Sequence, residues 1–172
     1  LKPYAVTNAG AALLALSRAQ GTGQPVSVVR AYHAYGPYQK PPPPFGTSPV
    51  RKIIPSFVCA ALLNAPLTIY GSGLQSVDLV HVDDVAETLV RALAGPYGQV
   101  IEAGSGLGSM VLDVANTVIY AAQSSSQLVA EPMRIGEPND RVVCATDPVI
   151  SNHWPYRLDD TITWYRRLLR LP

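Results

Sequence analysis

The sequence predicts an α/β fold organised around a parallel sheet. Short runs of β-branched and other apolar residues alternate along the 172 residues with longer runs rich in Ala and Leu, an order typical of strand–helix architectures. The run 26–32 is nearly continuous in apolar character, which indicates a parallel strand covered on both faces. Only one helix precedes it, so we expect its sheet to be incomplete. A chain of this length suffices for one domain with a hydrophobic core.

The first predicted element is a helix over 4–20, because Ala and Leu dominate this segment and Gly21 and Gly23 end it. Its apolar residues run around the whole circumference, which predicts burial on more than one side. After the strand 26–32, the run Pro41-Pro42-Pro43-Pro44 predicts an extended loop on the surface or at the mouth of an active site. Proline cannot donate a hydrogen bond into a sheet.

The remaining elements alternate in the same manner, and the stretch 124–138 is expected to be less regular. We expect helices over 53–64, 84–94, 110–123 and 158–169, and strands over 67–70, 77–82 and 100–103.

Charged residues near the predicted helix ends have a structural explanation. Asp83 and Asp84 stand where N-caps are expected, and adjacent side chains at a helix start point apart, so capping explains them better than paired acid/base chemistry. His81, in the strand before them, has no expected partner. The C-terminal cluster of arginines suits the end of the last helix, where cations interact favourably with the helix dipole. These are Arg166, Arg167 and Arg170.

Composition excludes several classes of function. The formal net charge is +1 and no basic run is present, so neither nucleic acid nor an anionic membrane is expected as a partner. The longest uncharged stretch, 53–77, is interrupted by Pro and Gly, and no signal peptide precedes it; we therefore expect no membrane span.

Cys59 and Cys144 lack metal-ligand spacing, so no metal site is expected and both are interpreted as core thiols in a reducing cytoplasm. Leu1 in place of an initial Met is compatible with a trimmed or incomplete chain.

Several segments, taken in order, resemble the second half of the extended short-chain dehydrogenases/reductases, the NAD-dependent epimerases and dehydratases of nucleotide sugars. Six or more such blocks span nearly the whole chain. They are Pro3-Tyr4-Ala5-Val6-Thr7-Asn8, Arg30-Ala31-Tyr32-His33-Ala34-Tyr35-Gly36-Pro37, Ile53-Ile54-Pro55-Ser56-Phe57, Leu67-Thr68-Ile69-Tyr70-Gly71-Ser72-Gly73, Val77-Asp78-Leu79-Val80-His81-Val82-Asp83-Asp84-Val85-Ala86, Glu102-Ala103-Gly104-Ser105-Gly106, Arg134-Ile135-Gly136-Glu137-Pro138 and Trp154-Pro155.

The resemblance implies an architecture. Residues 1–37 would form the last helix and strand of a Rossmann-like part, and residues 38–172 the smaller substrate-binding lobe, with the nucleotide sugar between them. The family's glycine-rich turn for the NAD pyrophosphate does not occur in this sequence. Gly104–Gly108 also follows a strand and precedes a helix, but it matches an ordinary loop of the family, so dinucleotide binding is not expected there.

The resemblance also implies residues for catalysis and for the cofactor NAD. Tyr4 corresponds to the tyrosine that exchanges a proton with a sugar hydroxyl. The lysine that lowers the pKa of this tyrosine, which is about 10 for a free phenol, is replaced by the neutral Asn8. Asn8, Tyr32 and His33 would lie on the cofactor side; His33 replaces the family's asparagine and could donate a hydrogen bond or titrate near neutral pH. An aromatic at a helix start and a structural His are the alternatives for Tyr4 and His33.

The implied substrate-binding residues come from four separate segments. Val77 stands where an arginine commonly holds the diphosphate, which leaves Arg134 as the candidate phosphate ligand, with a surface role as the alternative. The implied set is His33, Ile54, Pro55, Tyr70 and Arg134.

Three interpretations follow for the whole chain. The first is the C-terminal, substrate-binding part of an NAD-dependent nucleotide-sugar epimerase or dehydratase in the cytoplasm, with its other half in the same gene product or a partner chain. The second is a degenerate, non-catalytic relative that binds a nucleotide sugar or pairs with an active subunit, which Asn8 and Val77 favour. The third is an inactive fragment. The apolar helix 4–20 predicts association, and the family uses this helix in a homodimer.

Overall fold

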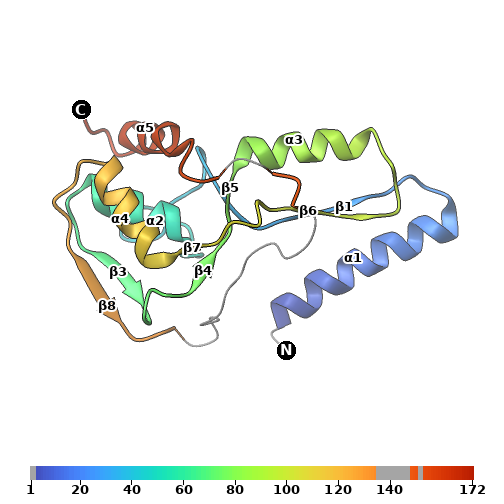
Figure 1. Cartoon of the computed structure of the whole chain (residues 1–172), viewed down its shortest axis with the longest axis horizontal. Helices are drawn as coiled ribbons and strands as arrows, with labels where there is room; N and C mark the ends of the chain where they lie inside the picture. The colour runs from blue at the N-terminus through green and yellow to red at the C-terminus, as the bar shows by residue number, and fades with distance from the viewer. Residues whose placement is uncertain (1–2, 135–147, 151–152) are drawn as a thin grey trace.

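The computed structural model describes residues 3–134, 148–150 and 153–172, and its elements alternate between strand and helix (Figure 1). The helices are α1 (Pro3–Thr22), α2 (Ile53–Leu62), α3 (Val82–Leu93), α4 (Val111–Ala121) and α5 (Leu158–Leu168). The strands are β1 (Val28–Ala31), β2 (His33–Tyr35), β3 (Leu67–Tyr70), β4 (Ser76–Val77), β5 (Leu79–His81), β6 (Val100–Ala103), β7 (Ser109–Met110) and β8 (Leu128–Glu131).

The strands pair two by two, and three of the four pairs are parallel. β1 pairs with β6, β2 with β5 and β3 with β8 in parallel register, whereas β4 and β7 are antiparallel. Helices α1 and α3 lie on opposite sides of the β1–β6 pair (Figure 1). The predicted α/β class with parallel strands is therefore confirmed.

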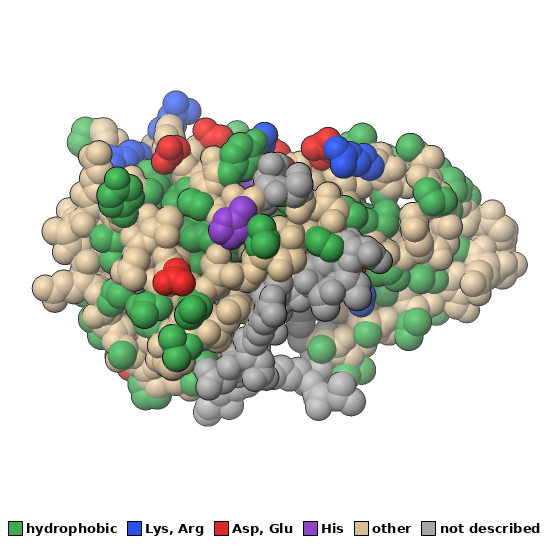
Figure 2. Space-filling view, viewed as in Figure 1, with side chains coloured by type: hydrophobic (Ala, Val, Ile, Leu, Met, Phe, Trp, Pro, Cys, Tyr) green, Lys and Arg blue, Asp and Glu red, His purple; other side chains and the backbone are tan. Residues whose placement is uncertain are grey.

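The larger hydrophobic core lies away from the N-terminal helix. It is built by α2, β3, α4 and α5, whose inward side chains include Val58, Leu67, Val118 and Tyr165, each fully buried. A smaller cluster around Val80 joins β1, β5, β6 and α3. On the face shown in Figure 2, acidic and basic side chains are interspersed over α5 and α3.

Helix α1 departs from the expectation of burial on several sides. Val6, Leu13 and Leu14 are 49%, 69% and 71% exposed, and Ala19 is the buried apolar residue of its last turns. The expectation is wrong for this chain taken alone, because α1 packs against the short strand β1 and its other sides face outward (Figure 1).

The predicted strand 77–82 differs from the observed bounds, and three strands, β2, β7 and β8, were not predicted. The predicted strand 77–82 divides at Asp78 into β4, which pairs with β7, and β5, which pairs with β2. β8 lies in the stretch expected to be irregular. Its sequence, Leu-Val-Ala-Glu, lacks the alternation of polar and apolar residues by which a half-buried strand is recognised, and all four side chains are exposed.

The N-cap of α3 is His81 rather than Asp83 or Asp84. The imidazole Nδ1 of His81 accepts a hydrogen bond from the backbone N–H of Asp83 at 3.3 Å, which leaves both aspartates in the first helical turn. The capping prediction was wrong because an imidazole nitrogen can accept this bond as a carboxylate does. The two aspartates do point apart: Asp84 is buried, whereas the Asp83 side chain is 65% exposed and bonds Arg157 Nη1 at 2.6 Å.

Other sequence expectations concern Cys59 and the membrane. Cys59 is buried as a free thiol in α2, and burial raises its pKa to about 12, which makes it unreactive at neutral pH. Cys144 lies outside the described residues. Among the helices that the structure describes, none has the length and apolar character needed to cross a bilayer.

Candidate functional site

The carboxyl ends of β1 and β6 mark the candidate site. The two strands are parallel and in register, from Val28 opposite Val100 to Ala31 opposite Ala103. Ligands of parallel α/β sheets bind at this end of the strands. Tyr32 and His33 follow β1 there, and the loop Gly104–Gly108 follows β6, so two of the predicted cofactor-side residues lie at this edge.

Backbone hydrogen bonds fix the position of His33. Its N–H donates to the carbonyl oxygen of Asp78 at 3.0 Å, and the preceding Tyr32 N–H donates to Ala103 O at 3.2 Å. The His33 side chain is half-buried, and its Nδ1 has no hydrogen-bond partner within the described part of the chain. Burial lowers the pKa of His33, against the opposing effect of the Asp78 carbonyl and carboxylate, so the imidazole is neutral at pH 7.

Asp78 is fully buried beneath the loop Gly104–Gly108. Its carboxylate accepts the Ser105 hydroxyl at 2.7 Å, the Ser105 N–H at 3.1 Å and the Gly106 N–H at 2.9 Å. Gly106 has a positive φ of 73°, which turns its N–H toward the same point as that of Ser105. The interpretation from sequence included Asp78 and Ser105 in the blocks that resemble the family but gave neither residue a role. Their signal was an aspartate within an apolar run, in a chain that also carries a Gly-Ser-Gly turn after a strand.

This arrangement decides how the glycine-rich loop can act. A phosphate bound there would need the amides of Ser105 and Gly106, which Asp78 already uses, and it would face the buried carboxylate. The residues present in the loop therefore do not fit the pyrophosphate of a dinucleotide.

The structure brings together Tyr70 and Arg134, two predicted substrate-binding residues. Tyr70 ends β3, and Arg134 follows β8, the parallel partner of β3. The guanidinium carbon of Arg134 lies 4.4 Å from the centroid of the Tyr70 ring, a cation–π contact. They are 64 positions apart in the sequence (134 − 70), and it is the unpredicted strand β8 that makes them neighbours.

Ile54 and Pro55 lie in the first turn of α2 and are both buried. Ile54 is 1% exposed and belongs to the main core cluster. Core packing thus accounts for both residues, and their role as ligand contacts stays a prediction.

Tyr4 and Asn8 lie in the first turns of α1. Because α1 and β1 run in opposite directions, the start of α1 lies on the side toward which the carboxyl end of β1 points (Figure 1). Asn8 is exposed, and the side chain of Tyr4 lies outside the described residues. The catalytic role of Tyr4 therefore stays a prediction.

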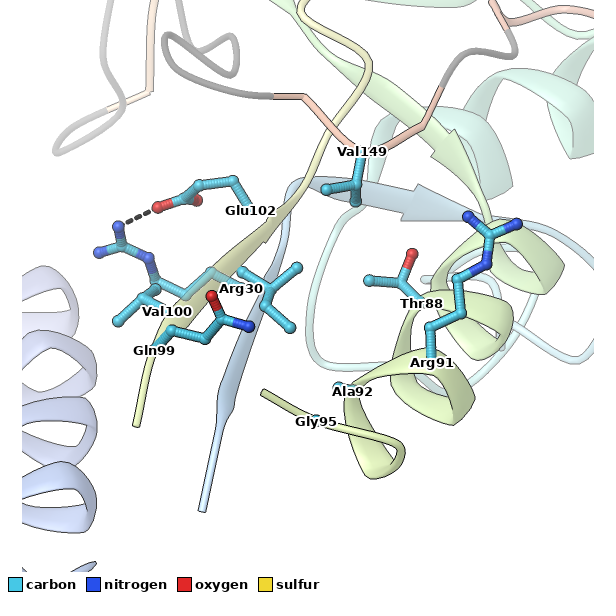
Figure 3. A pocket seen from close by; sticks show the side chains of 10 residues that line it. Arg30, Thr88, Arg91, Ala92, Gly95, Gln99, Val100, Glu102 and Val149 are labelled. Carbon is cyan, nitrogen blue, oxygen red and sulfur yellow. Dashed lines mark hydrogen bonds and ion pairs between the residues drawn. The ribbon is translucent and has the colours of Figure 1, made fainter. Parts of the chain in front are cut away.

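An open cavity of about 550 Å³ lies beside α3 and the β1–β6 pair (Figure 3). Its cationic side chains are paired: Arg30 bonds Glu102 on the neighbouring strand, and Arg91 bonds Glu87 at 2.6 Å. None of the predicted site residues lines it. The lining residues are Arg30, Thr88, Arg91, Ala92, Gly95, Gln99, Val100, Ile101, Glu102 and Val149.

Comparison with known proteins decides the family. Residues 1–104 match the model of the NAD dependent epimerase/dehydratase family. The chain belongs to this family. The predicted resemblance to extended short-chain dehydrogenases that act on nucleotide sugars is therefore confirmed.

Curated relatives of this family member include two bacterial enzymes of nucleotide-sugar metabolism. A dTDP-glucose 4,6-dehydratase from Actinoplanes sp. is 32% identical over 95% of this chain and 51% of its own length. A UDP-N-acetyl-alpha-D-glucosaminuronate decarboxylase from Bacillus cytotoxicus is 29% identical over 85% of this chain and 48% of its own length. The chain spans about half the length of these relatives.

Solved structures agree on the fold. The UDP-glucose 4-epimerase of Thermotoga maritima, determined with UDP-glucose, superposes with a TM-score of 0.86 at 22% identity, over 98% of this chain and 55% of that one. A dTDP-glucose 4,6-dehydratase from Streptomyces venezuelae, determined with NAD, gives a TM-score of 0.78 at 28% identity, over 96% of this chain and 51% of that one. The fold is that of part of a Rossmann-like epimerase/dehydratase.

Proposed function

We propose that this chain is the C-terminal, substrate-binding part of an NAD-dependent epimerase or dehydratase that acts on a nucleotide sugar. The observation that carries the proposal is the alignment of 95% of the chain, at 32% identity, with half of a dTDP-glucose 4,6-dehydratase. The contact between Tyr70 and Arg134 supports it, because an aromatic face and a guanidinium side by side suit a base and a phosphate.

Each proposed substrate-binding residue suits a different part of the nucleotide sugar. Arg134 supplies the positive charge for the diphosphate, a role that Val77 cannot fill. Tyr70 offers a ring face and a hydroxyl to the nucleoside. His33, neutral at pH 7, offers one N–H donor and one nitrogen acceptor to the sugar or its phosphate.

The proton-transfer role falls to Tyr4. In an epimerase or dehydratase the phenol would exchange a proton with a sugar hydroxyl, and NAD, when bound, would accept and return the hydride. Asn8 can hydrogen-bond a ribose hydroxyl but brings no cation to stabilise the phenolate. We propose that Tyr4, Asn8, Tyr32 and His33 would hold only the nicotinamide side of NAD, since the loop Gly104–Gly108 does not fit its pyrophosphate.

A non-catalytic nucleotide-sugar-binding or partner subunit is the second candidate. The uncharged residues at positions 8 and 77 favour it. In a chain joined to a glycine-rich NAD-binding half of the family, Asn8→Lys would raise turnover if the remaining machinery is competent. Sugar-nucleotide binding without any gain in turnover would favour the binding subunit.

The edge of β1 and the exposed face of α1 indicate which partners this chain would have. Among the described residues β1 pairs with β6 alone, and Val6, Leu13 and Leu14 of α1 are exposed. We infer that the remaining strands and helices of a Rossmann half cover this edge, supplied by the same gene product or by a partner chain. A homodimer through α1 and a cytoplasmic location complete the proposal.

Native mass spectrometry tests the proposal directly. The purified chain is measured alone, with NAD, and with UDP-glucose and dTDP-glucose. A complex with either sugar nucleotide supports the substrate-binding role, and bound NAD or a second polypeptide supports a working enzyme. A chain that stays bare with every ligand contradicts the proposal.

A further inference from the structure

The unusual feature of the candidate site is a fully buried aspartate, Asp78, that holds two segments of the chain. The Asp78 side chain holds the loop after β6 through Ser105 and Gly106, and its backbone carbonyl holds the N–H of His33. Burying an unpaired carboxylate is strongly unfavourable, and these donors offset that cost. Asp78 therefore ties the segments that follow β1 and β6 to each other.

The chain around Asp78 reaches the substrate side of the site in both directions. Before it, Val77 pairs with Ser109, whose hydroxyl accepts the indole N–H of Trp154 at 2.8 Å. After it, Leu79 pairs with His33. A displacement of Asp78 would thus move both the strand pair β4–β7 and the first residue of β2.

We propose that Asp78 is a positioning residue for nucleotide-sugar binding, which sets the distance between His33 and the loop Gly104–Gly108 at the carboxyl end of the sheet. This inference rests on the proposed function. The Asp78 carbonyl fixes the backbone of His33, and its carboxylate fixes the loop, so one residue determines the position of both segments. The half-buried imidazole, whose Nδ1 has no partner in the described part of the chain, is the group that Asp78 presents to the ligand.

Asp78→Asn tests the proposal, because the amide keeps the shape but turns an N–H₂ toward the N–H donors of the loop. The full chain is studied by NMR titration of the histidine ring protons and by calorimetry with UDP. We expect the His33 titration midpoint to fall, since the Asp78 carboxylate favours the protonated imidazole, and we expect UDP to bind about tenfold more weakly.

Two further variants calibrate this result. Ser105→Ala removes one bond to the carboxylate and retains the charge, so it should weaken UDP binding in the same direction but by less. Asp113→Asn, an exposed carboxylate in the first turn of α4, is the matched control and should change neither readout.

The outcomes separate this proposal from the proposed function. A folded Asp78→Asn chain with an unchanged His33 titration and unchanged UDP affinity overturns the positioning role. If Asp78→Asn does not fold, Ser105→Ala decides, and unchanged UDP affinity in that variant overturns it. If the unmodified chain does not bind UDP, the proposed function fails, and the His33 titration alone then decides whether Asp78 sets the state of this imidazole.

Discussion

Single residues separate this chain from the family pattern, and the structure shows what surrounds them. Asn8, where the family resemblance implies a lysine, is exposed on α1, whereas Val77, where it implies an arginine, lies half-buried in β4. Both changes remove a positive charge. Arg134 is the cation that the described structure places beside a predicted substrate contact, Tyr70.

Replacement of Arg134 should weaken ligand binding. We expect Arg134→Ala to bind UDP roughly 10- to 100-fold more weakly, because a hydrogen bond to a charged group contributes about 1.5–3 kcal/mol. Isothermal titration calorimetry measures this change, with the exposed Arg167→Ala on α5 as the control. Equal UDP affinity in the two variants would mean that Arg134 has only a surface role.

The Tyr70 ring should contribute through its face. Tyr70→Phe retains the face and should keep most of the UDP affinity, whereas Tyr70→Leu should lose about 1–3 kcal/mol of stacking. Tyr120→Leu, at a residue that is 86% exposed on α4, controls for loss of an aromatic ring. If Tyr70→Phe and Tyr70→Leu bind UDP equally well, the stacking role is wrong.

Stability should fall as the solution becomes acidic, because of His81. Burial lowers its pKa below 6.5, and this effect exceeds the opposing influence of Asp83. The unfolded chain therefore takes up a proton first as the pH falls through 6.5, so the free energy of unfolding should decrease from pH 7.5 to pH 5. One histidine contributes at most about 1.4 kcal/mol per pH unit.

Urea unfolding at several pH values measures this dependence. His81→Asn keeps an acceptor for the Asp83 N–H and removes the titration, so the pH slope should become smaller. His33, whose pKa is also lowered by burial, supplies part of the remaining slope. An unchanged slope in His81→Asn would contradict the assignment to His81.

At the level of elements, the strand pair β3–β8 positions the Tyr70–Arg134 contact. Leu67 and Leu128 face each other in register at the start of the pair, yet Leu67 is fully buried and Leu128 is 36% exposed. The burial of β3 in the core therefore anchors β8, none of whose own side chains is buried.

This difference predicts unequal costs of truncation. Leu67→Ala should lower the free energy of unfolding by about 2–5 kcal/mol, since it leaves a cavity in the core. Leu128→Ala, the matched variant across the pair, should cost less than about 1 kcal/mol. Chemical denaturation of both variants measures the contrast, and similar losses would show that β8 is not anchored as described.

At the level of the whole molecule, the N-terminal helix and strand lie outside the main core. The exposed side chains of Leu13 and Leu14 form an apolar surface on α1, and β1 has an edge with no partner strand among the described residues. Surfaces of this kind promote association in water.

Light scattering should therefore detect association of the purified chain. We expect the double variant Leu13→Asp, Leu14→Asp to shift the population toward monomer. Leu74→Asp, at an exposed leucine in the loop between β3 and β4, should not do so. A monomeric unmodified chain at high concentration would contradict this expectation.

The sequence by itself determined the fold class, the family and the approximate bounds of α2, α3, α4, α5, β3 and β6, because each depends on local composition and on motifs read in order. Only the tertiary structure decided the strand β8, the cap at His81 and the placement of Asp78 beneath Ser105. Each of these depends on a contact between side chain and backbone, or between distant strands, that no local pattern encodes. The same reason explains why the sequence suggested Tyr70 and Arg134 separately, while the pairing of β3 with β8 made them neighbours.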